Sequence, residues 1–355
     1  MKILSSEYFQ FRNIQSSRIA FSDEINIICG DNAVGKTSAI EGIYLCAQGR
    51  SHRTAKERDF IRFGEEIASV SLSYQDKNRV QSLGITFSTK GKKGCVRNGI
   101  PIRKMSEFIG HFRAVLFTPE HLSIVKEGPA MRRGFLDNAI SQLDPTYLLS
   151  LQRYVKILQQ RNRILAEASF HPEGLDTLDV WSMQLAEEGE LLSRKRAEYV
   201  ERADEKLRVI FSDMTEDREV PQLKYTGATA KEDLYKLLIG NIDREIRHGS
   251  TLYGIHKDDV GITVNRKEAR SYASQGQQRS LALALKLAEG EISREDTGEY
   301  PVFLFDDVLS ELDGRRKQYL MAGLSGKQVI ITTCEQTGFP ENSHVIHAKG
   351  GAFYE

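Results

Sequence analysis

Near its N-terminus the chain reads Gly30-Asp31-Asn32-Ala33-Val34-Gly35-Lys36-Thr37. Two glycines separated by four residues and followed by Lys and Thr form the Walker A pattern of a phosphate-binding loop. The apolar run at residues 25–29 predicts a buried strand before this loop, and residues 37–47 predict a helix after it. In that setting, backbone N–H groups and a helix N-terminus converge on one anion. The sequence therefore predicts an α/β nucleotide-binding protein.

All eight residues of this loop, called the P-loop below, are expected to bind ATP. Gly30 and Gly35 permit a tight backbone path close to the phosphates. Lys36 supplies a mobile positive charge to the β- and γ-phosphates and is expected to serve catalysis, and the Thr37 hydroxyl is expected to ligate Mg²⁺. A purely structural glycine-rich turn is the alternative, but the complete match with strand and helix in place disfavours it.

A second predicted strand ends in two acids. The apolar residues 302–305 are followed directly by Asp306 and Asp307, which is the Walker B form. Carboxylates at the carboxyl end of such a strand lie at the same sheet edge as the P-loop. Asp306 is expected to hold Mg²⁺, and Asp307 is expected to orient or deprotonate the attacking water. An isolated acid pair is more often a helix cap or an exposed turn, but the apolar run and the P-loop favour the catalytic interpretation.

Between these motifs lies Ser274-Gln275-Gly276-Gln277-Gln278, called the signature segment below. Ser274 followed three residues later by Gln277 is also an ordinary capping box for the apolar helix predicted after it. The two interpretations are compatible, because a capped helix N-terminus that exposes the Ser274 hydroxyl and the Gly276 N–H suits a phosphate group. Its place between the Walker motifs favours a phosphate-binding role.

Composition limits the class of protein. The chain has 355 residues, 40% hydrophobic and 28% charged, as in a soluble globular protein of roughly two to three domains. No apolar run approaches the ~20 residues that a membrane helix needs, and the N-terminus lacks a signal-peptide core, so a cytoplasmic protein without membrane association is expected. The cysteines form no CxxC pair, which indicates packing roles in a reducing compartment. They are Cys29, Cys46, Cys95 and Cys334.

Three parts are expected along the chain. Residues 1–119 form a strand-rich ATPase lobe with the P-loop, and residues 120–250 form a largely helical second lobe with helices of ordinary length or slightly more. Residues 251–355 form the C-terminal ATPase part with the signature segment and the Walker B acids. Alternation of buried strands and helices indicates an α/β fold with a mixed sheet. The 236 residues between Thr37 and Ser274 are too few, and too strand-like, for a long coiled coil.

The charge is unevenly distributed. The net charge is zero, but residues 50–113 hold 14 Lys and Arg against 6 Asp and Glu. These basic residues follow the predicted P-loop helix and continue into a hairpin that is predicted to reverse at Asn98-Gly99. The candidates for contact with DNA phosphates are Arg53, Lys56, Arg58, Lys92, Lys93 and Arg97. A solvated surface is the alternative meaning of the same charges.

The ordered set of Walker A, signature segment, Walker B and Ser310-Glu311-Leu312-Asp313 resembles the head domain of ABC-type ATPases. In that class the signature of one protomer closes on the ATP held by the other. Further stretches are similar, over essentially the whole chain, to motifs of the bacterial RecF family of DNA replication and repair proteins. They are Phe11-Arg12-Asn13, Gly49-Arg50-Ser51-His52-Arg53-Thr54, Arg132-Arg133-Gly134-Phe135-Leu136-Asp137, Gly254-Ile255-His256-Lys257-Asp258-Asp259 and Gln278-Arg279-Ser280-Leu281-Ala282-Leu283-Ala284-Leu285-Lys286.

The resemblance implies roles that the residues alone do not establish. Ser274, Gly276 and Gln277 would act in trans on the γ-phosphate held by a partner protomer. Asp313 would join Ser274 in the dimer interface, and Arg12 would lie near the nucleotide. ATP and Mg²⁺ would be the cofactors of an ATP-dependent homodimer that clamps duplex or gapped DNA. Slow hydrolysis would release the DNA, and mediator proteins of the RecO and RecR type would be partners.

The chain differs from the RecF family at two positions, and other classes of protein remain as alternatives. Ile255 and Lys257 stand where the family usually has Pro and Arg, and Lys cannot form a bidentate fork. The alternatives are the ATP-binding subunit of an ABC transporter, a chromosome-structuring head of the SMC kind and a small-molecule P-loop kinase. A metal-dependent nuclease built on Asp258 and Asp259 near His256 is a fourth, which the opposite directions of adjacent strand side chains disfavour.

Overall fold

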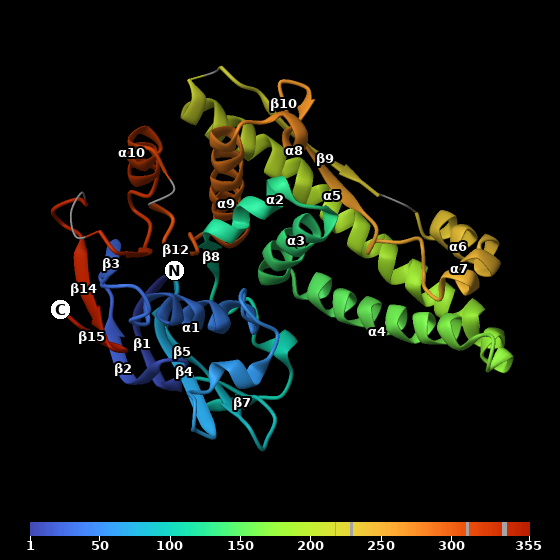
Figure 1. The fold of residues 1–355 in the computed structure, drawn as a ribbon, viewed down its shortest axis with the longest axis horizontal. Helices are drawn as coiled ribbons and strands as arrows, with labels where there is room; N and C mark the ends of the chain where they lie inside the picture. Colours follow the sequence, from blue (N-terminus) through green and yellow to red (C-terminus); the bar gives the residue numbers. More distant parts are fainter. Residues whose placement is uncertain (217, 228–229, 310–311, 336–338) are drawn as a thin grey trace. The chain divides into compact units, whose positions relative to one another are not determined.

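The computed structural model describes residues 1–216, 218–227, 230–309, 312–335 and 339–355, and these form two compact units (Figure 1). Unit 1 combines Met1–Leu122 with Arg279–Glu355, and unit 2 is Ser123–Gln278. Residues 251–278, which were expected in the C-terminal ATPase part, group with unit 2. The reason is that strand β10 (Asp259–Val264) pairs along its whole length with β9 (Pro221–Thr226).

The P-loop follows the third strand of a six-stranded sheet in unit 1, which has the order β15-β14-β3-β13-β12-β8. Neighbouring strands among β14, β3, β13, β12 and β8 are parallel, and β15 is antiparallel to β14. Parallel strands are covered on both faces, so they read as continuous apolar runs. The strands are β3 (Ile25–Cys29), β8 (Ala114–Phe117), β12 (Val302–Asp306), β13 (Val329–Thr333), β14 (His344–Lys349) and β15 (Ala352–Tyr354).

A second sheet of unit 1 is antiparallel and has the order β2-β1-β4-β5-β6-β7. Along β4 every second residue is buried, as expected of a strand with one face on a core. The hairpin between β6 and β7 turns at Asn98 (φ 51°) and Gly99 (φ 77°), which confirms the predicted reversal. The strands are β1 (Lys2–Phe11), β2 (Ile14–Ala20), β4 (Ile67–Gln75), β5 (Val80–Ser88), β6 (Gly94–Arg97) and β7 (Ile100–Ile102).

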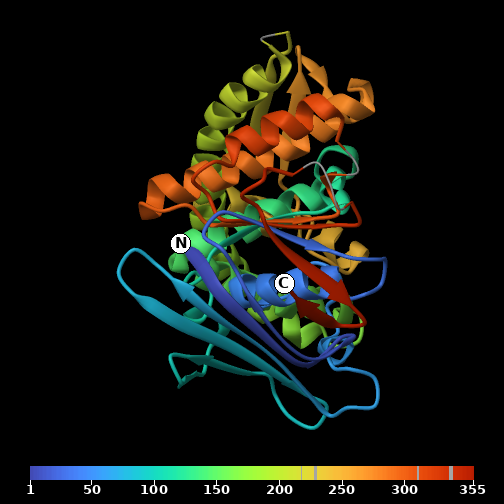
Figure 2. The ribbon, with the colours of Figure 1, turned by 90° about the vertical axis from the view of Figure 1, so that its left-hand side faces the viewer.

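Helix α1 (Lys36–Gln48) packs between these two sheets and contacts strands of both (Figure 2). All of its residues except Thr37 are buried, because both of its sides are covered. Apolar side chains from α1 and from both sheets form one continuous core. Among the residues that the structure describes, the other helical elements within unit 1 are η1 (Glu57–Phe60), η2 (Met105–Glu107), η3 (Pro119–Leu122) and α10 (Gly314–Gly323).

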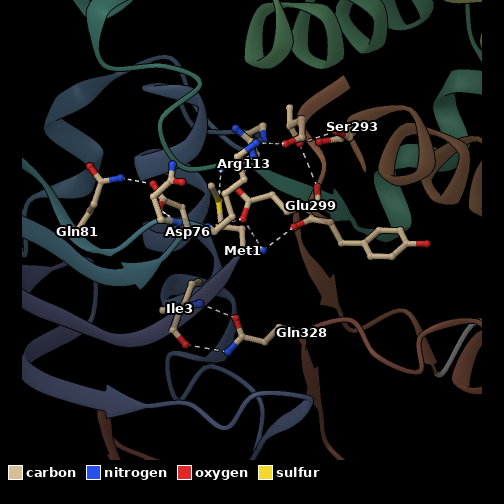
Figure 3. Close-up of polar contacts among 12 residues, drawn as sticks. Met1, Ile3, Asp76, Gln81, Arg113, Ser293, Glu299 and Gln328 are labelled. Carbon is tan, nitrogen blue, oxygen red and sulfur yellow. Dashed lines mark hydrogen bonds and ion pairs between the residues drawn. The ribbon is translucent and has the colours of Figure 1, made fainter. Parts of the chain in front are cut away.

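Polar contacts tie the chain's first residues to its C-terminal part (Figure 3). The Met1 ammonium lies 3.2 Å from Glu299 Oε2, and Arg113 Nη2 lies 2.8 Å from Glu299 Oε1. The Gln328 side chain accepts from the Ile3 N–H at 2.6 Å and donates to the Ile3 carbonyl at 2.8 Å. The contacting residues lie 186 or more positions apart in the sequence, so the N- and C-terminal segments form unit 1 together.

Unit 2 is largely helical, as expected, with a small sheet of order β11-β10-β9. Helix α5 spans 38 residues, well beyond the ordinary lengths expected, because it packs in turn on α4, α6 and β9. Near residue 241 the helical segment after β9 is interrupted, and Asn241 separates α6 from α7. The elements not yet given are α2 (Ser123–Lys126), α3 (Pro129–Leu143), α4 (Pro145–Glu167), η4 (Pro172–Thr177), α5 (Leu178–Thr215), α6 (Lys231–Gly240), α7 (Ile242–His248), β11 (Lys267–Glu268) and α8 (Ala269–Tyr272).

Helix α9 (Gln275–Thr297) begins in unit 2 and continues in unit 1. Among the described residues, no helix is both long enough and apolar enough to cross a lipid bilayer.

Candidate functional site

A pocket of about 930 Å³ opens beside the P-loop, and all of its lining residues belong to unit 1. P-loop residues form one part of the wall, and the Walker B acid Asp307 and Thr332 form another. A third part comes from Arg12 and the residues that follow α1. The lining residues are Arg12, Asn13, Asn32, Ala33, Gly35, Lys36, Thr37, Ser38, Arg53, Asp59, Ile61, Arg62, Phe63, Asp307 and Thr332.

The backbone of the P-loop requires both of its glycines. Gly30 (φ +156°) lies so close to the Ala348 carbonyl oxygen that an added Cβ would come within 2.3 Å of it. Gly35 (φ +115°) precedes α1, whose first turn has no side-chain cap. The N–H groups of that turn and the positive end of the helix dipole therefore face the pocket without a side-chain acceptor. This is the arrangement that favours a phosphate group.

The Lys36 ammonium group is folded back on the loop. Its Nζ donates to the carbonyl oxygens of Gly30 at 2.6 Å and Asp31 at 2.7 Å, and its side chain is largely buried. The same Nζ lies 3.4 Å from the Cys334 sulfur, and that thiol donates to Asn32 Oδ1 at 3.0 Å. Cys334 is exposed, unlike the other three cysteines, so the expectation of a packing role for it is wrong.

The two Walker motifs meet at a single carboxylate. Asp306 Oδ1 accepts hydrogen bonds from Thr37 Oγ1 at 3.0 Å and from Thr332 Oγ1 at 2.6 Å. Burial raises the pKa of Asp306, and the two hydroxyl contacts oppose that shift. A carboxylate and a hydroxyl are hard oxygen donors of the kind that Mg²⁺ takes, since this ion keeps most of its ligands as water and phosphate oxygens. The donor set at Thr37 and Asp306 therefore fits Mg²⁺.

Asp307 has a left-handed backbone (φ 54°), which is unusual for a residue other than glycine. Its N–H donates to Thr332 Oγ1 at 3.0 Å, and the residue lines the pocket. The turn after β12 thus directs the two adjacent acids differently. Asp306 is held among hydroxyl groups, and Asp307 is exposed at the pocket wall.

Two residues of the pocket wall and one buried residue behind it are not indicated by the sequence patterns that predict the P-loop. Asn13 Nδ2 donates to the Ala33 carbonyl at 3.0 Å, and Asn13 Oδ1 accepts from Ser38 Oγ at 2.9 Å. Glu41, buried on α1, accepts from Arg12 and Arg53. In the sequence, Glu41 stands out as an acid within the apolar run of the P-loop helix. A carboxylate buried there requires a positively charged partner.

The signature segment lies at the start of α9, and Ser274 and Gln275 are exposed. The Ser274 N–H donates to Gln277 Oε1 at 2.6 Å and the Gln277 N–H donates to Ser274 Oγ at 3.2 Å, which confirms the capping box. Gln277 Nε2 also donates to Glu219 Oε1 at 2.6 Å. Gly276, in the first turn of the same helix, is partly exposed.

Asp313 is the N-cap of α10. Its carboxylate accepts from the Arg316 N–H at 2.9 Å, and this hydrogen bond lowers the pKa of Asp313. The Arg316 guanidinium in turn donates to Ser280 Oγ at 2.7 Å. Ser310 and Glu311 of the same motif lie outside the described residues.

The six basic residues predicted to contact DNA differ in their exposure and in their polar contacts with other residues of the chain. Lys93 Nζ lies 2.8 Å from Glu57 and Arg97 donates to Gln81, so both are held in place. Arg53 contacts Glu41 but is 45% exposed at its side chain. Lys56, Arg58 and Lys92 are also exposed.

In unit 2 the acids of residues 254–259 serve contacts within the fold. Asp259 forms a bidentate pair with Arg132, with distances of 2.7 and 2.9 Å. Asp258 accepts from Tyr225 Oη, and Arg133 donates to its carbonyl oxygen at 2.9 Å. The two RecF-like stretches at residues 132–137 and 254–259 therefore bind one another. Lys257 is exposed and Ile255 is buried, so the fold itself accommodates both departures.

A P-loop joined to Walker B acids across a mixed sheet, with a helix-capping signature segment in the same chain, defines an ATPase head of the ABC type. Residues 3–350 match the family model described as the RecF/RecN/SMC N terminal domain. A DNA replication and repair protein RecF from Agathobacter rectalis is 40% identical, over 96% of this chain and 94% of the relative. The RecF of Clostridium novyi is 39% identical, over 94% and 92%.

Solved structures agree. A structure titled as the recombination mediator protein RecF with ATP in the RecFOR pathway superposes with a TM-score of 0.93 at 32% identity, over 99% of this chain and 97% of that chain. An Smc head from Pyrococcus furiosus has a TM-score of 0.58 at 16% identity, which reflects a shared fold. The chain belongs to the RecF family of DNA replication and repair proteins.

Proposed function

We propose that this chain is an ATP-dependent DNA-binding protein of recombinational repair and replication, in which ATP closes two copies into a clamp on DNA. The contact between Thr37 and Asp306 carries the proposal, because it places the phosphate-binding and Walker B groups in one pocket. The relative named for the RecFOR pathway is described with ATP, which supports the same nucleotide here. The match to RecF relatives over nearly the whole chain disfavours a transporter subunit or an SMC-type head.

Within the pocket, the uncapped first turn of α1 and the ammonium group of Lys36 bind the β- and γ-phosphates. Lys36 would exchange its contacts with the loop carbonyls for phosphate oxygens. Thr37 and Asp306 would hold Mg²⁺, which neutralises phosphate charge when bound. Asp307 at the pocket wall orients the attacking water and accepts its proton. Asp307 stands where ABC transporters typically have Glu, and its side chain is one methylene shorter, so we infer that the water is held loosely and hydrolysis is slow.

The second half of each site comes from a partner copy. The Ser274 hydroxyl, the Gly276 N–H and the N-terminus of α9 offer donors to the γ-phosphate in the partner's pocket. Gln277 would reach it by releasing Glu219, the acceptor of its side-chain amide. Asp313 would contribute to the same interface. ATP therefore links the two protomers through its γ-phosphate, and hydrolysis breaks this link.

The exposed cations Lys56, Arg58 and Lys92 would contact the phosphates of duplex or gapped DNA, with Arg53, Lys93 and Arg97 nearby in sequence. We propose mediator proteins of the RecO and RecR type as partners and the cytoplasm as the location. Lys36 and Asp307 would be the catalytic residues of a weak ATPase. Residues 1–122 with 279–355 would form its ATPase head.

The test is DNA affinity measured with and without a slowly hydrolysed ATP analogue, over a series of salt concentrations. Affinity should rise with nucleotide, and the logarithm of the binding constant should fall linearly with that of the salt concentration. Equal affinity in both states would overturn the coupling of ATP to DNA.

A further inference from the structure

One buried carboxylate lies behind the wall of the nucleotide pocket. Glu41 is 0% exposed, yet it accepts hydrogen bonds from three side chains. Arg12 Nε donates to Oε2 at 2.9 Å and Arg12 Nη2 donates to Oε1 at 2.7 Å, which is a bidentate fork. Arg53 Nη1 donates to Oε2 at 3.3 Å, and Ser51 Oγ donates to Oε1. Both arginines line the pocket, and Glu41 does not.

The two arginines are held to different degrees. Arg12 is 18% exposed at its side chain, and its guanidinium group also lies 5.2 Å from the centre of the Phe60 ring. Arg53 is 45% exposed and makes one longer contact with the carboxylate. Arg12 is therefore held by a bidentate fork and by the Phe60 ring, whereas Arg53 is more exposed and has a single contact with the carboxylate.

We propose that Glu41 is a positioning residue, which fixes the Arg12 guanidinium in the wall of the nucleotide pocket without touching the nucleotide. The inference rests on the proposed binding of ATP in that pocket. A buried carboxylate with two charge-assisted hydrogen bonds confines Arg12 to one rotamer, so that its remaining donors face the pocket in advance. Removing the charge of Glu41 frees Arg12 while leaving every nucleotide contact chemically intact.

The experiment measures the Kd of a fluorescent ATP analogue with Mg²⁺ and without DNA, for Glu41→Gln, Arg12→Gln and the double variant. Each single variant should weaken binding by about tenfold, the range of one charge-assisted hydrogen bond. The double variant should bind no more weakly than Arg12→Gln alone, because both changes remove the same positioned group. Thermal unfolding of each variant is measured in parallel.

The matched control is Glu289→Gln. Glu289 is also a buried carboxylate of unit 1 and contacts Lys286, but neither residue lines the pocket. This change should lower stability and leave the Kd for the analogue unchanged. Parent-like binding by Glu41→Gln, or additive losses in the double variant, would overturn the inference.

If Glu41→Gln does not fold, the variant Arg12→Lys tests the same proposal. Lys keeps the positive charge but cannot form the fork, so it should bind the analogue as weakly as Arg12→Gln. Parent-like binding by Arg12→Lys would likewise overturn the inference. Failure of the parent itself to bind the analogue would instead refute the proposed function.

Discussion

The Thr37 hydroxyl oxygen lies 3.0 Å from Asp306 Oδ1, although 269 positions separate the two residues in the sequence. Thr37 lies in the first turn of α1, after β3, and Asp306 ends β12. Only β13 stands between β3 and β12 in the sheet, and its Thr332 hydroxyl contacts the same carboxylate oxygen at 2.6 Å. The last residue of the P-loop and the first Walker B acid are thus held together by the strand order.

Thr37→Val should remove the Mg²⁺ dependence of ATP binding. Valine keeps the shape of the side chain but has no oxygen for the ion or for Asp306. With Mg²⁺ the variant should bind ATP about tenfold more weakly than the parent, the scale of one strong polar contact. Titration of a fluorescent ATP analogue with Mg²⁺ and with EDTA measures this. EDTA should weaken ATP binding by the parent and by the control Thr86→Val, which changes an exposed residue of β5. If EDTA weakened binding by Thr37→Val to the same extent, Thr37 would not be a Mg²⁺ ligand.

Asp307→Asn should bind ATP like the parent and hydrolyse it about 100-fold more slowly, the usual scale for loss of a general base. Asn tolerates the left-handed backbone of this position, so the substitution tests the carboxylate without straining the turn. Phosphate release under single-turnover conditions measures the step. Hydrolysis at the parent's rate would exclude Asp307 as the general base.

Replacing both Lys56 and Arg58 with Ala should weaken DNA binding without altering ATP affinity. If each contacts one phosphate, the slope of log binding constant against log salt concentration should shrink by about 2. Fluorescence anisotropy with labelled duplex at several salt concentrations gives that slope. Arg18→Ala, an exposed cation on β2, is the matched control and should keep the parent's slope. An unchanged slope in the double variant would remove these residues from the DNA contact.

Stability should fall as pH drops from about 6.5 to about 4, partly because of His256. Burial lowers the pKa of His256 to about 4, and its ring lies between Tyr154 Oη at 2.8 Å and the Thr251 carbonyl at 3.0 Å. The folded state therefore favours neutral His256. Its contribution is complete above the unfolded pKa of about 6.5 and is lost towards pH 4, for a total of about 3 kcal/mol.

Urea unfolding of the parent and of His256→Gln over this pH range measures the effect. The variant should lose less stability between pH 6.5 and 4, since carboxylates that titrate in the same range are common to both proteins. Identical pH dependence would contradict the role assigned to His256.

The sequence predicts strand β3, the P-loop and strand β12 with its acids, because buried parallel strands and glycine-lysine loops have local signatures. The capping box at Ser274 is equally local and is confirmed by its two hydrogen bonds. The sequence does not predict strand β14 or the edge strand β15. Strand β14 pairs with β3, which lies more than 300 positions away in the sequence, and β15 pairs with β14.

Long-range polar pairs could not be predicted either. Nothing adjacent to Glu41 in the sequence indicates that Arg12 is its partner, and nothing near Asp259 indicates Arg132. The length of α5 was underestimated because its apolar spacing does not show that α4, α6 and β9 all pack along it. Composition identifies a basic region, but only the structure separates engaged cations such as Lys93 from exposed ones such as Lys92.

The shared ATP site is tested most directly by light scattering of the parent and of Ser274→Arg, with and without a slowly hydrolysed ATP analogue. The arginine removes the cap of α9, at a cost of about 1 kcal/mol in stability, and fills the surface that would face a partner's γ-phosphate. Ser16→Arg, at an exposed position of β2, adds the same charge and is the matched control. With the analogue, the molar mass should double for the parent and for Ser16→Arg, while Ser274→Arg should stay monomeric and still bind nucleotide. A parent that remains monomeric when saturated, or a Ser274→Arg protein that dimerises like the parent, would contradict the account.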